Sequence, residues 1–145
     1  MKFKINLDTK LLSIPFNIAD LRITDQGTLN YTWECTEYPD FNSSSDVIDA
    51  IVDTVIEDQV IAKVNKMLKS TLPDNIYRSI PLTVDGKEDS VRVKVTDLHI
   101  DKHCRLIFDF NWSACLLDAV MYGIVFHQIR SQMIEIINGV FDTID

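Results

Sequence analysis

The chain has 145 residues, of which 46% are hydrophobic and 25% charged, and this balance predicts one globular domain over residues 1–145. Its 22 acidic and 14 basic side chains give a net charge of −8, which argues against nucleic-acid binding because a phosphate backbone would be repelled. The longest apolar stretch, 114–126, contains Asp118 and Gly123 and is too short to cross a bilayer, and the first 16 residues lack the apolar core of a signal peptide.

The first third of the chain predicts three strands. Apolar and polar residues alternate over 2–7, and a break is expected at 14–16 around Pro15. Strands over 20–25 and 28–37 follow, joined by the turn residues Gln26 and Gly27.

A long helix is predicted next, ending near Leu72, where Pro73 stops it. The run from Ser43 to Asp46 fits a capping box at its start. Acidic residues fill its first half and lysines its end, an order that suits the helix dipole.

The second half of the chain predicts strands over 80–84, 90–101 and 104–112, with a hairpin turn at Asp85 and Gly86. A second helix is expected over 113–138, with Gly139 as its stop. This helix is apolar nearly all round in its first half, which indicates burial on most sides or contact with a partner.

Two segments of the chain resemble each other. The sequence DLRITDQGTLNYTW starts at Asp20, and DLHIDKHCRLIFDF starts 77 positions later at Asp97. The helices align at an offset of 69, where VIDAIV matches LLDAVM. Chance similarity between amphipathic segments is the alternative; the repeat interpretation gives two strand–strand–helix units, at about 14–72 and 80–141.

These units predict an α+β fold. Each hairpin has one apolar face and each helix one apolar stripe, so the elements must cover one another. The arrangement we expect is a strongly twisted antiparallel sheet wrapped on two long helices that lie side by side.

Residues that carry chemistry are sparse. No GxSxG, HExxH, P-loop or GxGxxG motif occurs, and the three cysteines form no CxxC pair. His99, Asp101 and His103 would share a face with Cys104 beside them if their strand continued, which could form a metal site; a solvated hairpin end is the interpretation we favour. We therefore predict no metal and no cofactor.

Paired carboxylates in the two helices offer a second chemical interpretation. Asp49 and Asp118 occupy equivalent helix positions and could perform acid–base work, but a carboxylate early in a helix has a structural explanation. His127 is expected on a polar helix face. The sequence thus predicts a binding protein with no catalytic residues.

The surplus of apolar helix surface supplies the candidate binding residues. They are expected either to face a protein partner or to line a lipid groove between the helices and the sheet. The candidates are Val52, Val55, Ile56, Val120, Met121, Ile124, Val125 and Phe126.

A family resemblance adds to this interpretation. The runs VNKMLKSTLPDNI, IPLTVDG, SVRVKVTDLHID and CRLIFDFNW resemble the tubular lipid-binding (TULIP) superfamily, whose members wrap a twisted antiparallel sheet along a long helix. More closely, the opening LLSIPFNIADLRITDQGTLNYTWEC and the chain length resemble the smallest OrfX-type members of the P47/OrfX family, found in botulinum neurotoxin gene clusters.

The resemblance implies a non-toxic accessory protein that is soluble, secreted without a classical signal peptide and assembled with other OrfX-type proteins. It also implies possible lipid or phosphoinositide binding. Two hypotheses follow: a protein-interaction module, and a lipid-binding protein with an apolar groove.

Overall fold

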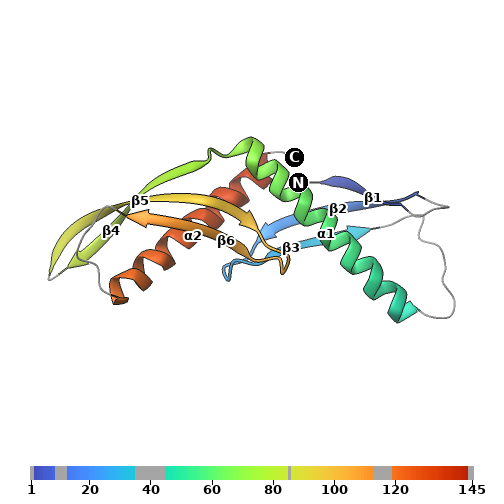
Figure 1. Cartoon of the computed structure of the whole chain (residues 1–145), viewed down its shortest axis with the longest axis horizontal. Coiled ribbons are helices and arrows are strands. Elements are labelled where there is room, and N and C mark those ends of the chain that lie inside the picture. Colours follow the sequence, from blue (N-terminus) through green and yellow to red (C-terminus); the bar gives the residue numbers. More distant parts are fainter. Residues whose placement is uncertain (1, 9–12, 35–44, 85, 113–118, 144–145) are drawn as a thin grey trace.

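The computed structural model describes residues 2–8, 13–34, 45–84, 86–112 and 119–143, which form six strands and two helices (Figure 1). In chain order these are β1 (Phe3–Asp8), β2 (Ser13–Ile23), β3 (Leu29–Glu34), α1 (Ser45–Thr71), β4 (Asn75–Val84), β5 (Lys87–Ile100), β6 (Leu106–Trp112) and α2 (Ala119–Thr143).

Most predicted elements are present, and their bounds differ most in three places. The expected break at 14–16 does not occur, because β2 begins at Ser13 and this segment pairs with β1. β4 begins at Asn75, five residues earlier than expected. α2 continues past Gly139 to Thr143, and the expected helix start at 113–118 lies outside the described residues, as do Ser43 and Ser44 of the predicted capping box.

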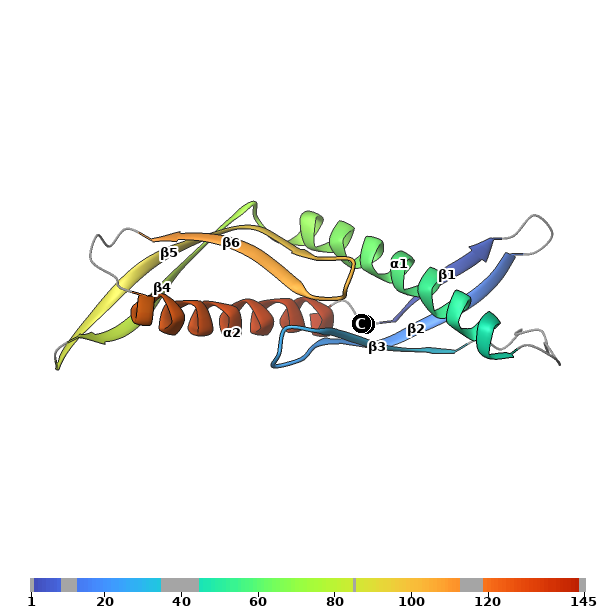
Figure 2. The ribbon, with the colours of Figure 1, turned by 60° about the horizontal axis from the view of Figure 1, so that its bottom comes forward.

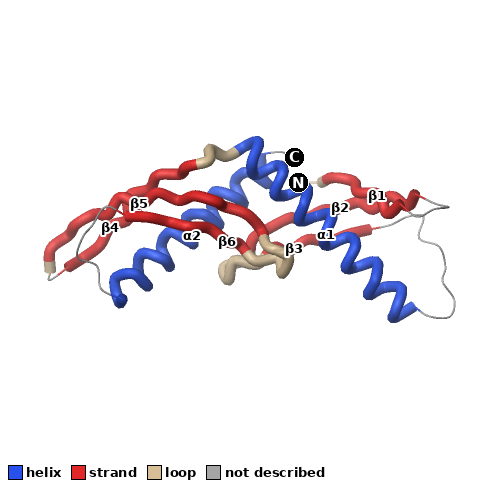
Figure 3. The backbone as a smooth tube through the Cα atoms, in the orientation of Figure 1, coloured by secondary structure: helices blue, strands red, loops and turns tan. Residues whose placement is uncertain are grey.

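The strands form two sheets, so the prediction of a single sheet wrapped on both helices is wrong. Strands β1, β2 and β3 form one antiparallel sheet in that order, and β4, β5 and β6 form the other (Figure 3). Each repeat unit therefore contributes three strands and a helix, rather than two strands and a helix. The α+β class itself holds.

The helices do not lie side by side. Figures 1 and 2 show an elongated molecule in which α1 and α2 start at opposite ends and approach each other only near the centre. Each helix packs against the first strand of its own unit and the middle strand of the other: α1 against β1 and β5, α2 against β4 and β2. The two units are therefore interlocked and share one continuous hydrophobic core.

The two sheets repeat each other down to their irregularities. Asp20 in β2 and Asp97 in β5 both have φ of 56°, and each lies within a shift of strand register. Positive φ is uncommon outside glycine, and a bulge at these two places bends both middle strands in the same way. The offset of 77 positions predicted for the strands is thus correct.

The hairpin turns of the two units meet at the centre of the molecule. Thr28 forms an isolated antiparallel bridge with Arg105, its own counterpart 77 positions later. The Leu29 N–H donates to the Cys104 carbonyl at 2.8 Å, and the Leu106 N–H donates to the Gly27 carbonyl at 2.8 Å. This exchange places a pseudo-twofold axis between the two turns.

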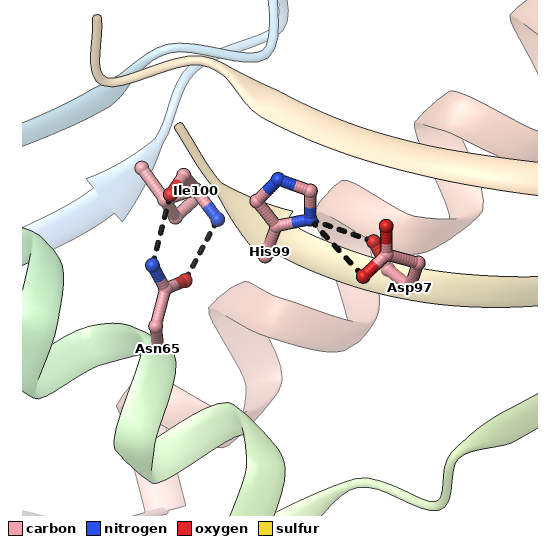
Figure 4. A network of polar contacts seen from close by, with 4 residues as sticks. All are labelled: Asn65, Asp97, His99 and Ile100. Atoms are coloured by element: carbon pink, nitrogen blue, oxygen red, sulfur yellow. Dashed lines mark hydrogen bonds and ion pairs between the residues drawn. The ribbon is translucent and has the colours of Figure 1, made fainter. Parts of the chain in front are cut away.

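One asparagine in each helix bonds that helix to the opposite unit. In α1, Asn65 accepts the Ile100 N–H at 2.7 Å and donates to the Ile100 carbonyl at 2.8 Å (Figure 4). In α2, Asn138 accepts the Ile23 N–H at 2.8 Å and donates to the Ile23 carbonyl at 3.0 Å. Each amide replaces the strand partner that these backbone groups lack where the middle strand ends.

These asparagines also correct the predicted alignment of the helices. Asn138 follows Asn65 by 73 positions, not 69. The same offset of 73 superimposes buried positions Ile56, Val60, Val64 and Leu68 on buried positions Ile129, Met133, Ile137 and Phe141. The alignment of the two helices predicted from the sequence is therefore wrong by four residues, about one helical turn.

Candidate interaction surface

A cluster of five aromatic rings lies between β6 and the first half of α2. Alternate side chains of β6 face α2, among them Phe108, Phe110 and Trp112, because side chains of a strand alternate between its two faces. Tyr122 and Phe126 meet them from α2, where a spacing of four residues puts both on one helix face. We call these five residues the aromatic ladder.

The rings of the aromatic ladder are in direct contact. Phe108 stacks on Phe126 with centroids 5.8 Å apart and planes 15° apart. Phe110 lies 5.4 Å from Tyr122 and 6.0 Å from Phe126, and Trp112 meets Tyr122 edge-on at 5.2 Å. Such pairs contribute about 0.5–1.5 kcal/mol each beyond the area that they bury.

The aromatic ladder is only partly covered. Tyr122 is 50% exposed, and the other four rings are half-buried. Arg130 closes one end, with its guanidinium 5.9 Å from the centre of the Phe126 ring. Ladder residues therefore form apolar surface that is accessible at the edge of the second sheet, which is the property expected of a contact site.

The sequence interpretation placed only Phe126 of this ladder among the candidates. Phe108, Phe110, Trp112 and Tyr122 were missed. Their signal was present as the alternating aromatics of FDFNW and the aromatic pair four residues apart in α2. What was missing was the knowledge that this strand and this helix face each other.

The candidate binding residues are divided between the two helices. Val55 and Ile56 lie on α1, while Ile124, Val125 and Phe126 lie on α2, and the two helices start at opposite ends of the molecule (Figure 2). Ile56 and Val125 are fully buried, and Ile124 is 43% exposed. The side chains of Val52, Val120 and Met121 lie outside the described residues.

The second half of α2 is not the free apolar surface that its composition suggested. Ile129, Met133 and Ile137 are 0% exposed, and Phe141 is 1% exposed. These side chains belong to the shared core, because α2 reaches across to β2 of the first unit. On α2, candidate partner surface therefore lies in the first turns that the structure describes.

Recesses elsewhere on the molecule have mixed polar and apolar linings. One of about 560 Å³ lies against the first sheet, lined by Lys2, Lys4, Asn17, Ile18, Thr32 and Glu34 among others. A second of about 270 Å³ lies beside the end of α1, and its lining is mostly apolar, with Leu68, Leu72, Ile76, Val95 and Leu98 beside Asp97 and His99. Neither is lined by any of the eight candidates.

A buried thiol lies near the centre of the molecule. The Cys104 Sγ donates to Glu57 Oε1 at 2.9 Å, and burial together with this carboxylate raises the pKa of the thiol to about 12. Burial, aided by Cys104 and Glu57, also raises the pKa of Tyr31 to about 12. Both groups stay protonated at neutral pH, which argues against Cys104 as a nucleophile.

Residues of the suspected metal site have structural partners. β5 ends at Ile100, so Asp101 and His103 lie in the turn. The Asp101 carboxylate accepts the N–H groups of Arg105 and His103, both at 2.9 Å, and these bonds lower its pKa. His99 Nδ1 lies 2.8 Å from the Asp97 carbonyl (Figure 4).

Other titratable candidates give no site either. Within the described residues, no three His, Cys, Asp or Glu side chains are grouped as metal ligands. His127 is exposed on α2, as predicted. Asp118 and the side chain of Asp49 lie outside the described part of the chain.

Among the helices that the structure describes, neither is long and apolar enough to cross a membrane. Comparisons with models of known protein families, with curated proteins and with solved structures found no match for this chain.

Proposed function

We propose that the chain is a non-catalytic protein-interaction module that binds its partner through the aromatic ladder. The observation that supports this proposal is the exposure of stacked rings at a sheet edge: Tyr122 is 50% exposed although it touches three other rings. Aromatic residues with a buried body and an exposed rim are enriched at protein interfaces.

The resemblance to the P47/OrfX family supplies the partner class for this proposal. We propose that the chain acts as a secreted accessory protein of a neurotoxin gene cluster and assembles with larger proteins of that family. The interlocked units favour a preformed binding surface, because each helix is held by strands of both sheets.

The test is co-elution on size exclusion of the purified chain with purified P47- and OrfX-type proteins. We expect a heteromeric peak for the natural chain and its loss for Tyr122→Ser. Tyr77→Ser is the matched control, because Tyr77 is 48% exposed but lies on β4, where Arg92 covers its ring at 5.2 Å. Failure of every cluster protein to shift the elution of the natural chain would reject the proposal.

A further inference from the structure

We infer that the aromatic ladder receives one extended segment of a partner protein, added to β6 as a fourth strand and alternating aliphatic with basic residues. This inference rests on the proposed interaction function and specifies its geometry. Three features support this binding mode: the open backbone edge of β6, the ring surface beneath that edge and the charge around it.

The backbone edge of β6 is open. β6 is the last strand of its sheet, and on its far side the Leu106 N–H donates to the Gly27 carbonyl, the one backbone pairing there among the residues that the structure describes. From that bridge β6 and β3 run apart toward opposite ends of the molecule (Figure 2). Within the described residues, no strand pairs with this side of 107–112. An exposed row of N–H and C=O groups is a template for a further strand.

This edge also lacks the usual protection against pairing. Native edge strands are commonly blocked by proline or lysine. The other edge of the same sheet, β4, carries Pro81. β6 reads LIFDFNW, with neither proline nor lysine. The contrast within one sheet indicates that the β6 edge is left accessible.

The ring surface beneath the edge determines the inward residues of the partner. A strand added about 4.8 Å from β6 would place alternate side chains beside Phe108, Phe110 and Trp112. These rings are half-buried between β6 and α2, so a new neighbour would complete their cover. Branched aliphatic side chains pair well with aromatic ones across strands.

Charge determines the outward residues. The outer face of β6 carries exposed Asp109, Lys94 of β5 lies on the same face opposite Asn111, and the whole chain has a net charge of −8. Lysine or arginine at outward positions would therefore be attracted, while an acidic segment would be repelled. The same charge disfavours a second copy of this chain as the occupant, since each copy carries −8.

The probe is a capped seven-residue peptide that alternates valine with lysine. The full chain carries Trp33→Phe, which leaves Trp112 of the ladder as its one tryptophan. We expect saturable change in Trp112 emission with this peptide and none with a valine–glutamate peptide. A tenfold weaker affinity is expected for Tyr122→Ser, and an unchanged affinity for Tyr77→Ser.

Two methylated peptides test strand addition directly. In a strand, all residues whose side chains face one way direct their N–H groups to the same edge. Methylating the backbone nitrogens of the valines blocks one edge of the peptide, and methylating the backbone nitrogens of the lysines blocks the other. We expect one methylated peptide to bind at least tenfold more weakly and the other to bind like the parent, because each lost hydrogen bond weakens binding.

Equal binding by both methylated peptides, or no saturable signal from the parent, would overturn strand addition. Neither result would reject the interaction function, whose test is co-elution with the whole partner proteins. Conversely, co-elution that Tyr122→Ser leaves intact would reject the aromatic ladder as the contact surface, whatever the peptides do.

Discussion

The two units share a backbone design but differ in the chemistry around it. At an offset of 73 positions, Asp53 and Glu57 of α1 occupy the places that Phe126 and Arg130 have in α2. The first unit therefore presents carboxylates where the second presents an aromatic ring and a guanidinium. Tyr31, the counterpart of Phe108, lies near those carboxylates, whereas Phe108 stacks on Phe126.

The features common to both units are those that join them. Bulges, turn bridges and asparagine contacts recur with the same atoms in each half. By contrast, the side chains differ in charge and size where the last strand of each unit meets its helix. We call these two places, at Tyr31 with Asp53 and at Phe108 with Phe126, the strand–helix junctions. This division indicates that the joining contacts determine the fold, while the junctions are free to acquire binding properties.

Removing the two asparagines should have the largest effect on stability, and it tests whether the two units are equivalent. Asn138→Ala leaves the N–H and carbonyl of Ile23 buried without partners, which should lower the free energy of unfolding by about 3 kcal/mol. The Asn65 side chain itself is only half-buried, so water can take the place of its amide more easily, and Asn65→Ala should cost about 1–2 kcal/mol. Urea unfolding of both variants measures the difference, and a larger loss for Asn65→Ala would contradict the burial argument.

A reciprocal exchange tests the contrast between the junctions. Phe126→Asp gives α2 the residue of α1, and should cost about 2 kcal/mol because a half-buried ring with three stacking partners is lost. Asp53→Phe makes the opposite change at an exposed site and should alter stability by less than about 0.5 kcal/mol.

The same pair of variants has a second readout. Asp53 is one of the charges that raise the pKa of Tyr31, so Asp53→Phe should lower that pKa. Spectrophotometric titration of tyrosine measures it, with Phe126→Asp as the control that leaves Tyr31 unaffected. Similar stability losses for the two variants would mean that the junctions are not chemically distinct.

Alkaline pH should destabilise the chain through Tyr31 of the first unit and Cys104 of the second. The pKa values of Cys104 and Tyr31 are about 12 when folded, against ordinary values of 9.0 and 10.0. Because the unfolded chain loses these protons first, the contribution of these two groups to the free energy of unfolding should be constant below about pH 9 and fall between pH 9 and 12. Urea unfolding at several pH values measures the slope.

Glu57→Gln provides the matched variant for this pH dependence. Removing the carboxylate beside Cys104 removes one cause of the raised pKa, so the decline should become shallower. An unchanged slope would show that other groups dominate the alkaline transition.

Local structure was predictable from sequence, but the pairing of distant elements was not. Alternation of apolar and polar residues located most strands, and Pro73 marked the end of α1. Alternation does not specify which strands share a sheet, and the single sheet that we expected is wrong. The aromatic ladder depends on which face of β6 meets α2, and the sequence pattern does not specify that contact either.

The helix offset shows the physical limit most clearly. A shift of four residues rotates an α-helix by about 400°, so the apolar stripe returns within about 40° of its starting direction. Offsets of 69 and 73 therefore give similar burial patterns, and the matching Asp-Ala pair favoured the wrong one. Only a specific polar contact, such as that of Asn65 or Asn138, fixes the axial position.

Gly139 gives the smallest expected effect and tests the corrected end of α2. It occupies the place of Lys66 in α1, and apart from its chain neighbours and the nearby backbone of its own helix, a β-carbon added there would meet no atom within 4 Å. Because the helix continues to Thr143, Gly139→Ala should raise the free energy of unfolding by about 0.5–1 kcal/mol through helix propensity. If α2 instead ended at this glycine in a left-handed conformation, as the sequence suggested, alanine would be destabilising by a similar amount. The sign of the change in urea unfolding thus decides whether the last turn of α2 matches the continuous helix of its counterpart.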